Sequence, residues 1–109
     1  RQRVEIIKAL YRQADILIVA AGVRGIVDGA MVKEGVVAVD VGIHAVKDEK
    51  TGKTRMVGDL DFESVAAKAD AITPVPGGVG PITDVWLVGN ALMAAAIAHQ
   101  VEPRFGLFR

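Results

Sequence analysis

The sequence predicts an α/β fold with a mainly parallel sheet, and three features of the chain support this. A continuous apolar run at residues 16–20 is typical of a strand that is covered on both faces, and residues 36–40, apolar up to Asp40, predict a second buried strand. The segment between them is too long for a tight hairpin and suits a crossover, so the two strands are expected to run parallel. A third apolar stretch at 71–73 leads into a turn rich in proline and glycine. With 109 residues, the chain is expected to form one domain with one core.

Further elements are expected between and before these strands. Apolar side chains recur at helical spacing over residues 3–13, which predicts an amphipathic helix. A short helical piece is expected near 29–34, and Gly35 would end it as a C-cap. The charged segment 47–55 is expected to form a hairpin turn in solvent.

The second half of the chain carries two expected helices. Asp61 is a good N-cap for a helix over 62–69. Gly80 and Pro81 can serve as N-cap and first residue of a helix that reaches about residue 99. This last helix is apolar around nearly its whole circumference, which indicates burial on every side or a membrane span. Polar residues interrupt it, so burial by another domain or subunit is expected and a membrane is not.

The composition excludes several classes of function. Thirteen basic and thirteen acidic residues balance, so no nucleic acid is expected as a partner. The chain has no cysteine, which excludes disulfides and thiolate chemistry, and no side chains show the spacing of metal ligands. The chain does not begin with methionine and shows no secretory signal, so a processed or partial protein is expected.

Four stretches of the sequence together resemble one enzyme family. Residues 73–83 read TPVPGGVGPIT, residues 14–22 ADILIVAAG, residues 36–43 VVAVDVGI and residues 57–62 VGDLDF. Taken in their order along the chain, they resemble the bifunctional methylenetetrahydrofolate dehydrogenase/methenyltetrahydrofolate cyclohydrolase family, in the later part of its C-terminal cofactor-binding domain. The family usually has proline near Arg24 and asparagine at position 44, where this chain has His44.

The resemblance implies a fold and a place in a larger enzyme. Residues 1–109 would form a single, partial NAD(P)-binding domain of Rossmann type, and the N-terminal catalytic domain is not in this chain. The family's Tyr-x-x-x-Lys pair, which includes the main catalytic lysine, has no counterpart here, since Asp15 stands four positions after Tyr11. No catalytic residue is therefore expected in this chain.

The resemblance also implies binding residues. A tetrahydrofolate derivative would lie against the turn formed by Pro76, Gly77, Gly78, Val79 and Gly80. NADP, or alternatively NAD, would contact Ala21 and Gly22 with its ribose or pyrophosphate, and Gly42 and Ile43 with its nicotinamide end. These four residues follow strand ends, where open α/β sheets bind ligands. The alternative is that both glycine-rich segments are only tight turns.

Other polar residues are expected to serve structure. No dinucleotide fingerprint lies upstream of Asp40, so a structural role is expected for it rather than ribose binding. Asp61 as a helix cap, with Asp59 as its neighbour, explains these two carboxylates. His44 is expected in a loop, and His99 near a helix end.

The resemblance implies oxidation of 5,10-methylenetetrahydrofolate and hydrolysis of the methenyl product, in a homodimer, in the cytoplasm or alternatively the mitochondrial matrix. Two other hypotheses about the function stay open. The chain could be a non-catalytic assembly module that docks a partner through its apolar terminal helix. It could also be the cofactor half of another dehydrogenase, such as a hydroxyacid enzyme, although the residues 74–83 speak against this.

Overall fold

A computed structural model describes residues 12–102, and the chain divides between Val79 and Gly80 into two compact units. Among residues 12–102, all the strands lie in the first unit, and the long C-terminal helix lies in the second except for its first residue, Val79. The helix predicted over 3–13 falls outside the described residues, except for 12 and 13, which form a turn.

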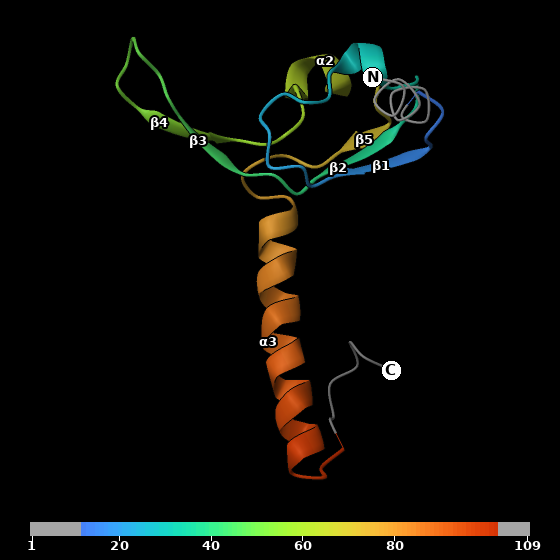
Figure 1. Cartoon of the computed structure of the whole chain (residues 1–109), viewed down its shortest axis with the longest axis vertical. Coiled ribbons are helices and arrows are strands. Elements are labelled where there is room, and N and C mark those ends of the chain that lie inside the picture. Colours follow the sequence, from blue (N-terminus) through green and yellow to red (C-terminus); the bar gives the residue numbers. More distant parts are fainter. Residues whose placement is uncertain (1–11, 103–109) are drawn as a thin grey trace. The chain divides into compact units, whose positions relative to one another are not determined.

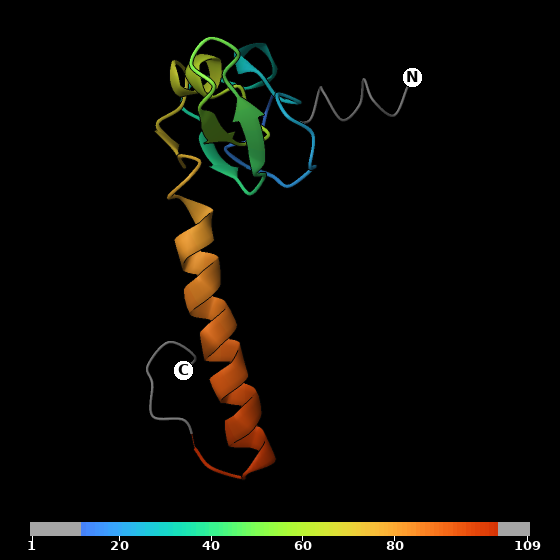
Figure 2. The ribbon, with the colours of Figure 1, turned by 90° about the vertical axis from the view of Figure 1, so that its left-hand side faces the viewer.

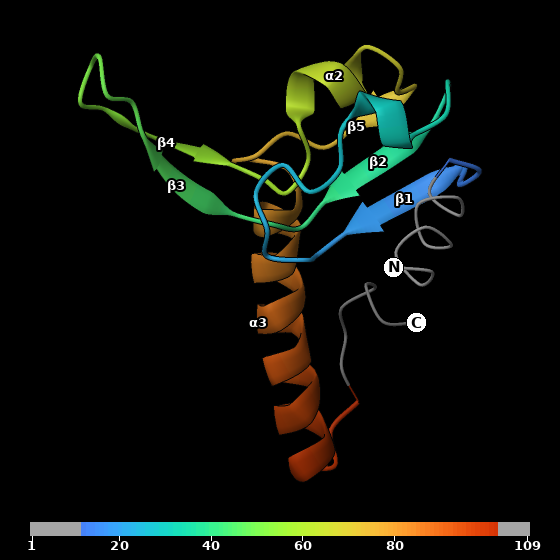
Figure 3. The ribbon, with the colours of Figure 1, turned by 45° about the horizontal axis from the view of Figure 1, so that its top comes forward.

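A three-stranded parallel sheet forms the centre of the first unit. Its strands are β1 (Ile16–Val19), β2 (Val37–Asp40) and β5 (Ala71–Ile72), in the order β1-β2-β5 (Figures 1 and 3). Val37 of β2 pairs with Ile16 on one side and Ala71 on the other, and both pairings are parallel. The predicted α/β fold with a parallel sheet is confirmed.

The core lies on one face of this sheet. The 3₁₀ helix η1 (Gly29–Met31) and the helix α2 (Phe62–Ala66) lie together over that face (Figure 1). The buried apolar side chains of the core are Leu17, Val19, Val27, Val32, Val36, Ala38, Leu60 and Val65. The two crossovers therefore cover the sheet from the same side.

Burial of β1 on both faces was predicted, and this is wrong for the described part of the chain. Leu17 and Val19 are buried, but Ile16 and Ile18 are 64% and 66% exposed. Side chains alternate between the faces of a strand, so the core covers only every second residue. Within residues 12–79, no element covers the other face of β1 enough to bury it.

The predicted hairpin is confirmed as a second, two-stranded sheet. The strands β3 (His44–Lys47) and β4 (Thr54–Val57) pair antiparallel and extend away from the parallel sheet (Figure 1). Asp48 shapes the turn, since its carboxylate accepts a hydrogen bond of 2.8 Å from the Lys50 N–H. This bond, with others from Thr51, holds the pKa of Asp48 below its ordinary value.

Both short helices are shorter than predicted. The first ends at Met31 instead of near residue 34, and α2 ends at Ala66 instead of 69. Asp61 stands at the N-cap of α2, but its side chain makes no hydrogen bond to the helix backbone. Its carboxylate accepts from the Ser64 hydroxyl at 2.6 Å, and the Ser64 hydroxyl oxygen accepts from the Gly29 N–H at 2.9 Å. Asp61 thus fixes the hydroxyl of Ser64, which links α2 to η1.

The C-terminal helix α3 (Val79–Ala98) matches its predicted limits within about a residue (Figure 2). It is long and apolar enough to cross a membrane by length and composition, with a mean hydropathy of 1.4. Its large exposed apolar side chains are Ile82, Val85, Trp86, Leu87, Val88, Leu92 and Ile97.

Val65 is the fully buried apolar side chain of α2 and tests whether this short helix belongs to the core. Val65→Ala is expected to lower the free energy of unfolding by about 2 kcal/mol, because it removes two buried methyl groups and leaves a cavity. The control Val23→Ala changes a side chain that is 52% exposed, and its effect should stay within about 0.5 kcal/mol. Urea denaturation measures both, and equal effects would contradict the core as described.

Candidate functional site

The segments that follow the three parallel strands meet at one edge of the sheet. Ala21 and Gly22 follow β1, Gly42 and Ile43 follow β2, and Thr73 follows β5. The carboxyl edge of a parallel sheet is where α/β proteins bind ligands. The four residues predicted to bind a cofactor therefore lie at the edge where such a site is expected.

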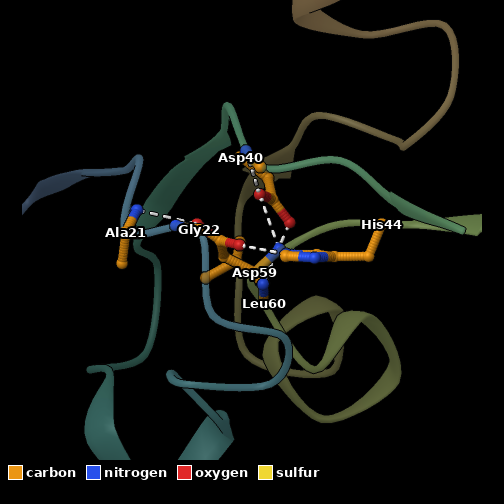
Figure 4. A network of polar contacts seen from close by, with 7 residues as sticks. Ala21, Gly22, Asp40, His44, Asp59 and Leu60 are labelled. Atoms are coloured by element: carbon orange, nitrogen blue, oxygen red, sulfur yellow. Dashed lines mark hydrogen bonds and ion pairs between the residues drawn. The ribbon is translucent and has the colours of Figure 1, made fainter.

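Asp59 lies at the centre of this edge and is completely buried. Its Oδ2 accepts hydrogen bonds from the Ala21 N–H at 2.8 Å and from the Gly22 N–H at 2.9 Å (Figure 4). Its Oδ1 lies 2.6 Å from Nε2 of His44, on strand β3. One carboxylate thus ties the end of β1 to the start of the hairpin.

Asp40, the last residue of β2, is a second buried carboxylate. Oδ1 accepts from the Asp59 N–H at 2.9 Å and from the Gly42 N–H at 3.1 Å. Oδ2 accepts from the Leu60 N–H at 3.0 Å (Figure 4). The structural role predicted for Asp40 is confirmed, because its carboxylate is occupied by three backbone donors.

Thr73 connects β5 to the same network. Its hydroxyl oxygen accepts a hydrogen bond of 2.9 Å from the N–H of Asp40. The ends of β1, β2 and β5 are therefore joined through Asp59, Asp40 and Thr73.

Two glycines lie against these carboxylates. A Cβ built on Gly42 would overlap the carboxylate of Asp59, and one built on Gly58 would overlap the carboxylate of Asp40. The backbone at both positions can approach only because a side chain is lacking. Gly42 is thus required by the packing of Asp59, whatever it contributes to a ligand.

The pKa of Asp59 lies below its ordinary value despite complete burial. Burial raises the pKa, because it disfavours the charged form. The hydrogen bond from His44 and those from the N–H groups of Gly22 and Ala21 lower it by more in sum. Asp59 is therefore a buried anion at neutral pH.

This arrangement limits what the corner after β1 can bind. The N–H groups of Ala21 and Gly22 point to Asp59, and the N–H of Gly42 points to Asp40. These three donors are not available to an anionic ligand. Gly22 has a left-handed φ of +68°, and a Cβ built there would meet no atom within 4 Å. The corner offers open space to a flat group rather than donors to a phosphate.

The predicted substrate turn is a second glycine corner. Gly77 has a φ of +97°, and a Cβ built on it would meet no atom within 4 Å. Gly78 is different, because its Cβ would lie 2.5 Å from the carbonyl oxygen of Pro74. The peptide bond before Pro76 is cis, and α3 begins at Val79. Gly77 thus presents open backbone, whereas Gly78 packs against the turn itself.

A cavity of about 940 Å³ opens in the first unit. It is lined by Arg24, Gly25, Asp28, Asp40, Arg55, Met56, Val57, Gly58, Leu60, Asp61, Phe62, Glu63, Pro74 and Val75. The residues predicted to bind cofactor or substrate are not among these. The cavity reaches the carboxyl edge of the sheet at Asp40, and its lining residues Pro74 and Val75 directly precede the predicted substrate turn.

Two residues of the network were misinterpreted from the sequence. The sequence predicts Asp59 only as the neighbour of a helix cap, whereas its carboxylate accepts hydrogen bonds from the N–H groups of Ala21 and Gly22. His44 was expected in a loop, but it lies in β3 with 24% of its side chain exposed and pairs with Asp59. A signal existed, because an aspartate between Gly58 and Leu60 in an apolar segment suggests a buried carboxylate. Among residues 12–102, no group of three or more His, Cys, Asp or Glu could hold a metal ion.

Residues 1–99 match the family described as tetrahydrofolate dehydrogenase/cyclohydrolase, NAD(P)-binding domain. The chain is 61% identical over 94 residues to the bifunctional protein FolD 3 of Rubrobacter xylanophilus, covering 84% of this chain and 30% of that protein. It is 55% identical over 91 residues to the mitochondrial bifunctional methylenetetrahydrofolate dehydrogenase/cyclohydrolase 2 of Rattus norvegicus, covering 84% and 27%.

Solved structures agree with the fold. The bifunctional 5,10-methylenetetrahydrofolate dehydrogenase/cyclohydrolase of Thermoplasma acidophilum matches with a TM-score of 0.75 and 40% identity, over 86% of this chain and 32% of that one. The Trypanosoma brucei N5,N10-methylenetetrahydrofolate dehydrogenase-cyclohydrolase, complexed with NADP and an inhibitor, matches with a TM-score of 0.71 and 42% identity, over 82% and 30%. The chain thus spans less than a third of these relatives, and their enzymatic names do not favour an assembly module.

The buried charge of Asp59 predicts a pH dependence of stability. Because its pKa is depressed in the folded state, its contribution is present above about pH 4 and is lost as the pH falls through the folded pKa. Asp59→Asn removes the charge, so the variant should be about 1–3 kcal/mol less stable at neutral pH and lose less stability on acidification. Urea denaturation between pH 3 and 7 measures this.

The control for that experiment is Glu49→Gln, which changes an exposed carboxylate of the hairpin turn. It should leave the acid-induced loss of stability nearly unchanged. An Asp59→Asn variant with the same acid dependence as the unmodified protein would contradict a charged, buried Asp59.

Proposed function

The chain belongs to the tetrahydrofolate dehydrogenase/cyclohydrolase family, and we propose that it is the cofactor-binding part of a methylenetetrahydrofolate dehydrogenase and methenyltetrahydrofolate cyclohydrolase. In this proposal, its 109 residues are one partial NAD(P)-binding domain of Rossmann type. The observation that carries it is the pair of open glycine corners, one at Gly22 after β1 and one at Gly77 after β5. The names of the relatives support the reaction.

The cofactor is NADP, or alternatively NAD, and it lies against Ala21, Gly22, Gly42 and Ile43. The description of the family and the NADP bound by the Trypanosoma brucei relative support this choice. Open space beside Gly22 fits a flat ring or a ribose, and the N–H groups held by Asp59 make a pyrophosphate site there unfavourable. Ile43, 62% exposed, offers its backbone to the nicotinamide amide. The bound cofactor supplies a hydride acceptor.

The substrate is a tetrahydrofolate derivative that lies against Pro76, Gly77, Gly78, Val79 and Gly80. The open backbone at Gly77 allows close approach of a planar pterin or aminobenzoate ring. This chain orients the two reactants, and such positioning alone can lower a barrier substantially. The groups that transfer protons in the hydrolysis step lie in the N-terminal catalytic domain, because the chain lacks the Tyr-x-x-x-Lys pair.

Assembly follows from the same proposal. The working enzyme is a homodimer in which this domain contacts the N-terminal catalytic domain, and no nucleic acid or membrane takes part. It works in the cytoplasm or, alternatively, in the mitochondrial matrix. Bacterial and mitochondrial relatives support either compartment.

A crossed pair of variants tests the assignment of the two corners. Gly22→Ala and Gly77→Ala each place a Cβ into open space at a left-handed φ, so both carry a similar strain of about 1 kcal/mol. Gly22→Ala should raise the Kd for NADP about tenfold and leave binding of a folate analogue within about twofold. Gly77→Ala should do the reverse. Titration calorimetry on the protein at its natural full length measures all four dissociation constants.

The matched strain makes the two variants controls for each other. If both variants weakened the binding of both ligands equally, the substitutions would be acting through the stability of the protein. This result would contradict the assignment. Absence of binding of either ligand to the unmodified protein would contradict the proposed function.

A separate prediction concerns the chain by itself. Residues 1–109 alone should bind NADP weakly and produce no NADPH from 5,10-methylenetetrahydrofolate, because the catalytic groups are elsewhere. The absorbance of NADPH measures turnover, with a full-length enzyme of the family as positive control. Steady NADPH production by the 109 residues would show that they contain the catalytic groups.

A further inference from the structure

His44 stands out among the groups at the carboxyl edge, because the function proposed above gives it no task. It is one of two histidines in the chain, and only 24% of its side chain is exposed. Its contact with the buried carboxylate of Asp59 is therefore a structural feature that the proposed function does not use.

We propose that His44 is a positioning residue for the cofactor, acting through Asp59 to fix the distance between the Ala21–Gly22 corner and the Gly42–Ile43 corner. This inference rests on the proposed function, because it assumes that the cofactor lies against both corners.

The covalent and non-covalent connections of His44 support this role. It directly follows Ile43 in the chain, so its backbone belongs to the corner after β2. Its ring Nε2 lies 2.6 Å from Oδ1 of Asp59. The other oxygen of that carboxylate holds the two N–H groups of the corner after β1. His44 and Asp59 thus form the bridge between the two corners (Figure 4).

The orientation of Asp59 depends on this bridge. A carboxylate accepts only, so Nε2 of His44 must carry the proton in this contact, and it can do so in either charge state of the ring. Oδ1 of Asp59 receives the His44 contact, whereas Oδ2 receives both backbone N–H groups. Without His44, a buried anion would keep donors on one oxygen only. The carboxylate would then be free to rotate or to draw in water, and the turn at Gly22 would lose its fixed partner.

Packing against Gly42 also lets the Asp59 carboxylate set the distance between the two corners. A Cβ at Gly42 would overlap Asp59, so the backbone of the β2 corner already touches the side chain that holds the β1 corner. A movement of Asp59 therefore changes both corners together.

The experiment compares three variants for NADP affinity and for hydrogen exchange of two backbone amides. His44→Leu removes the donor at similar size, and it should raise the Kd for NADP about tenfold and speed exchange at Ala21 and Gly22 about tenfold. His44→Gln keeps an N–H donor of similar reach and should restore both values to within about threefold. His99→Leu, in the other histidine, should change neither. All measurements use the protein at its natural full length.

A double-mutant cycle shows whether His44 acts through Asp59. In an Asp59→Asn background, His44→Leu should change the Kd for NADP less than twofold, since the acceptor that it positions has lost its charge. Full additivity of the two effects would overturn the proposal. Asp59→Asn also tests it if His44→Leu does not fold, because it should itself weaken NADP binding and speed exchange at the same two amides.

The outcomes separate this proposal from the proposed function. Faster exchange in His44→Leu with an unchanged Kd for NADP overturns the positioning role and leaves the function intact. A lower affinity in His44→Leu that His44→Gln does not restore also overturns the role, because a general loss of structure would then explain it. Failure of the unmodified protein to bind NADP overturns the proposed function and this inference with it.

Discussion

The burial of two carboxylates at the ends of parallel strands is the constraint on which the rest of this edge depends. A buried charge is tolerated only when hydrogen bonds replace the water that it has lost. Asp40 meets this requirement with three backbone N–H groups, and Asp59 with two backbone N–H groups and His44. Because the donors come from segments far apart in sequence, satisfying the carboxylates also fixes where those segments lie. The corner that would face a cofactor is shaped by this requirement before any ligand binds.

The same requirement explains why the edge is rich in glycine. Backbone N–H groups can surround a carboxylate only where the chain comes very close to it. Gly42 and Gly58 provide that approach, since a Cβ at either position would overlap a carboxylate. Gly22 and Gly77 have another role, because they have positive φ values and open space beside them. Glycines that look alike in the sequence therefore serve two purposes, packing at 42 and 58 and open access at 22 and 77.

Much of the fold was predictable from the sequence, because it depends on local patterns. The strands at Ile16–Val19 and Val37–Asp40 follow from uninterrupted apolar runs, and the hairpin follows from the charged turn that Asp48 closes. The site was predictable only in outline. The position of Gly22 and Gly42 at strand ends could be inferred, but Asp59 as the partner of the Gly22 N–H could not. Asp59 lies 37 residues from Gly22 and 15 from His44, and no local pattern records contacts over such distances. The exposed face of β1 was missed for a related reason, since an apolar run does not tell what covers it.

The N–H groups that Asp59 occupies after β1 also limit which part of a dinucleotide can bind at this corner. A pyrophosphate is usually held by free N–H groups at a glycine-rich turn that opens a helix. After β1 those N–H groups are occupied by Asp59, and the segment that follows leads to a three-residue 3₁₀ helix, too short for a substantial dipole. The negative carboxylate of Asp59 would also repel a phosphate bound at this turn. This corner is therefore suited to the uncharged or cationic parts of a cofactor. In the function proposed above, that part is a ribose or a flat ring such as the nicotinamide, whose oxidised form carries a positive charge that the buried charge of Asp59 would favour.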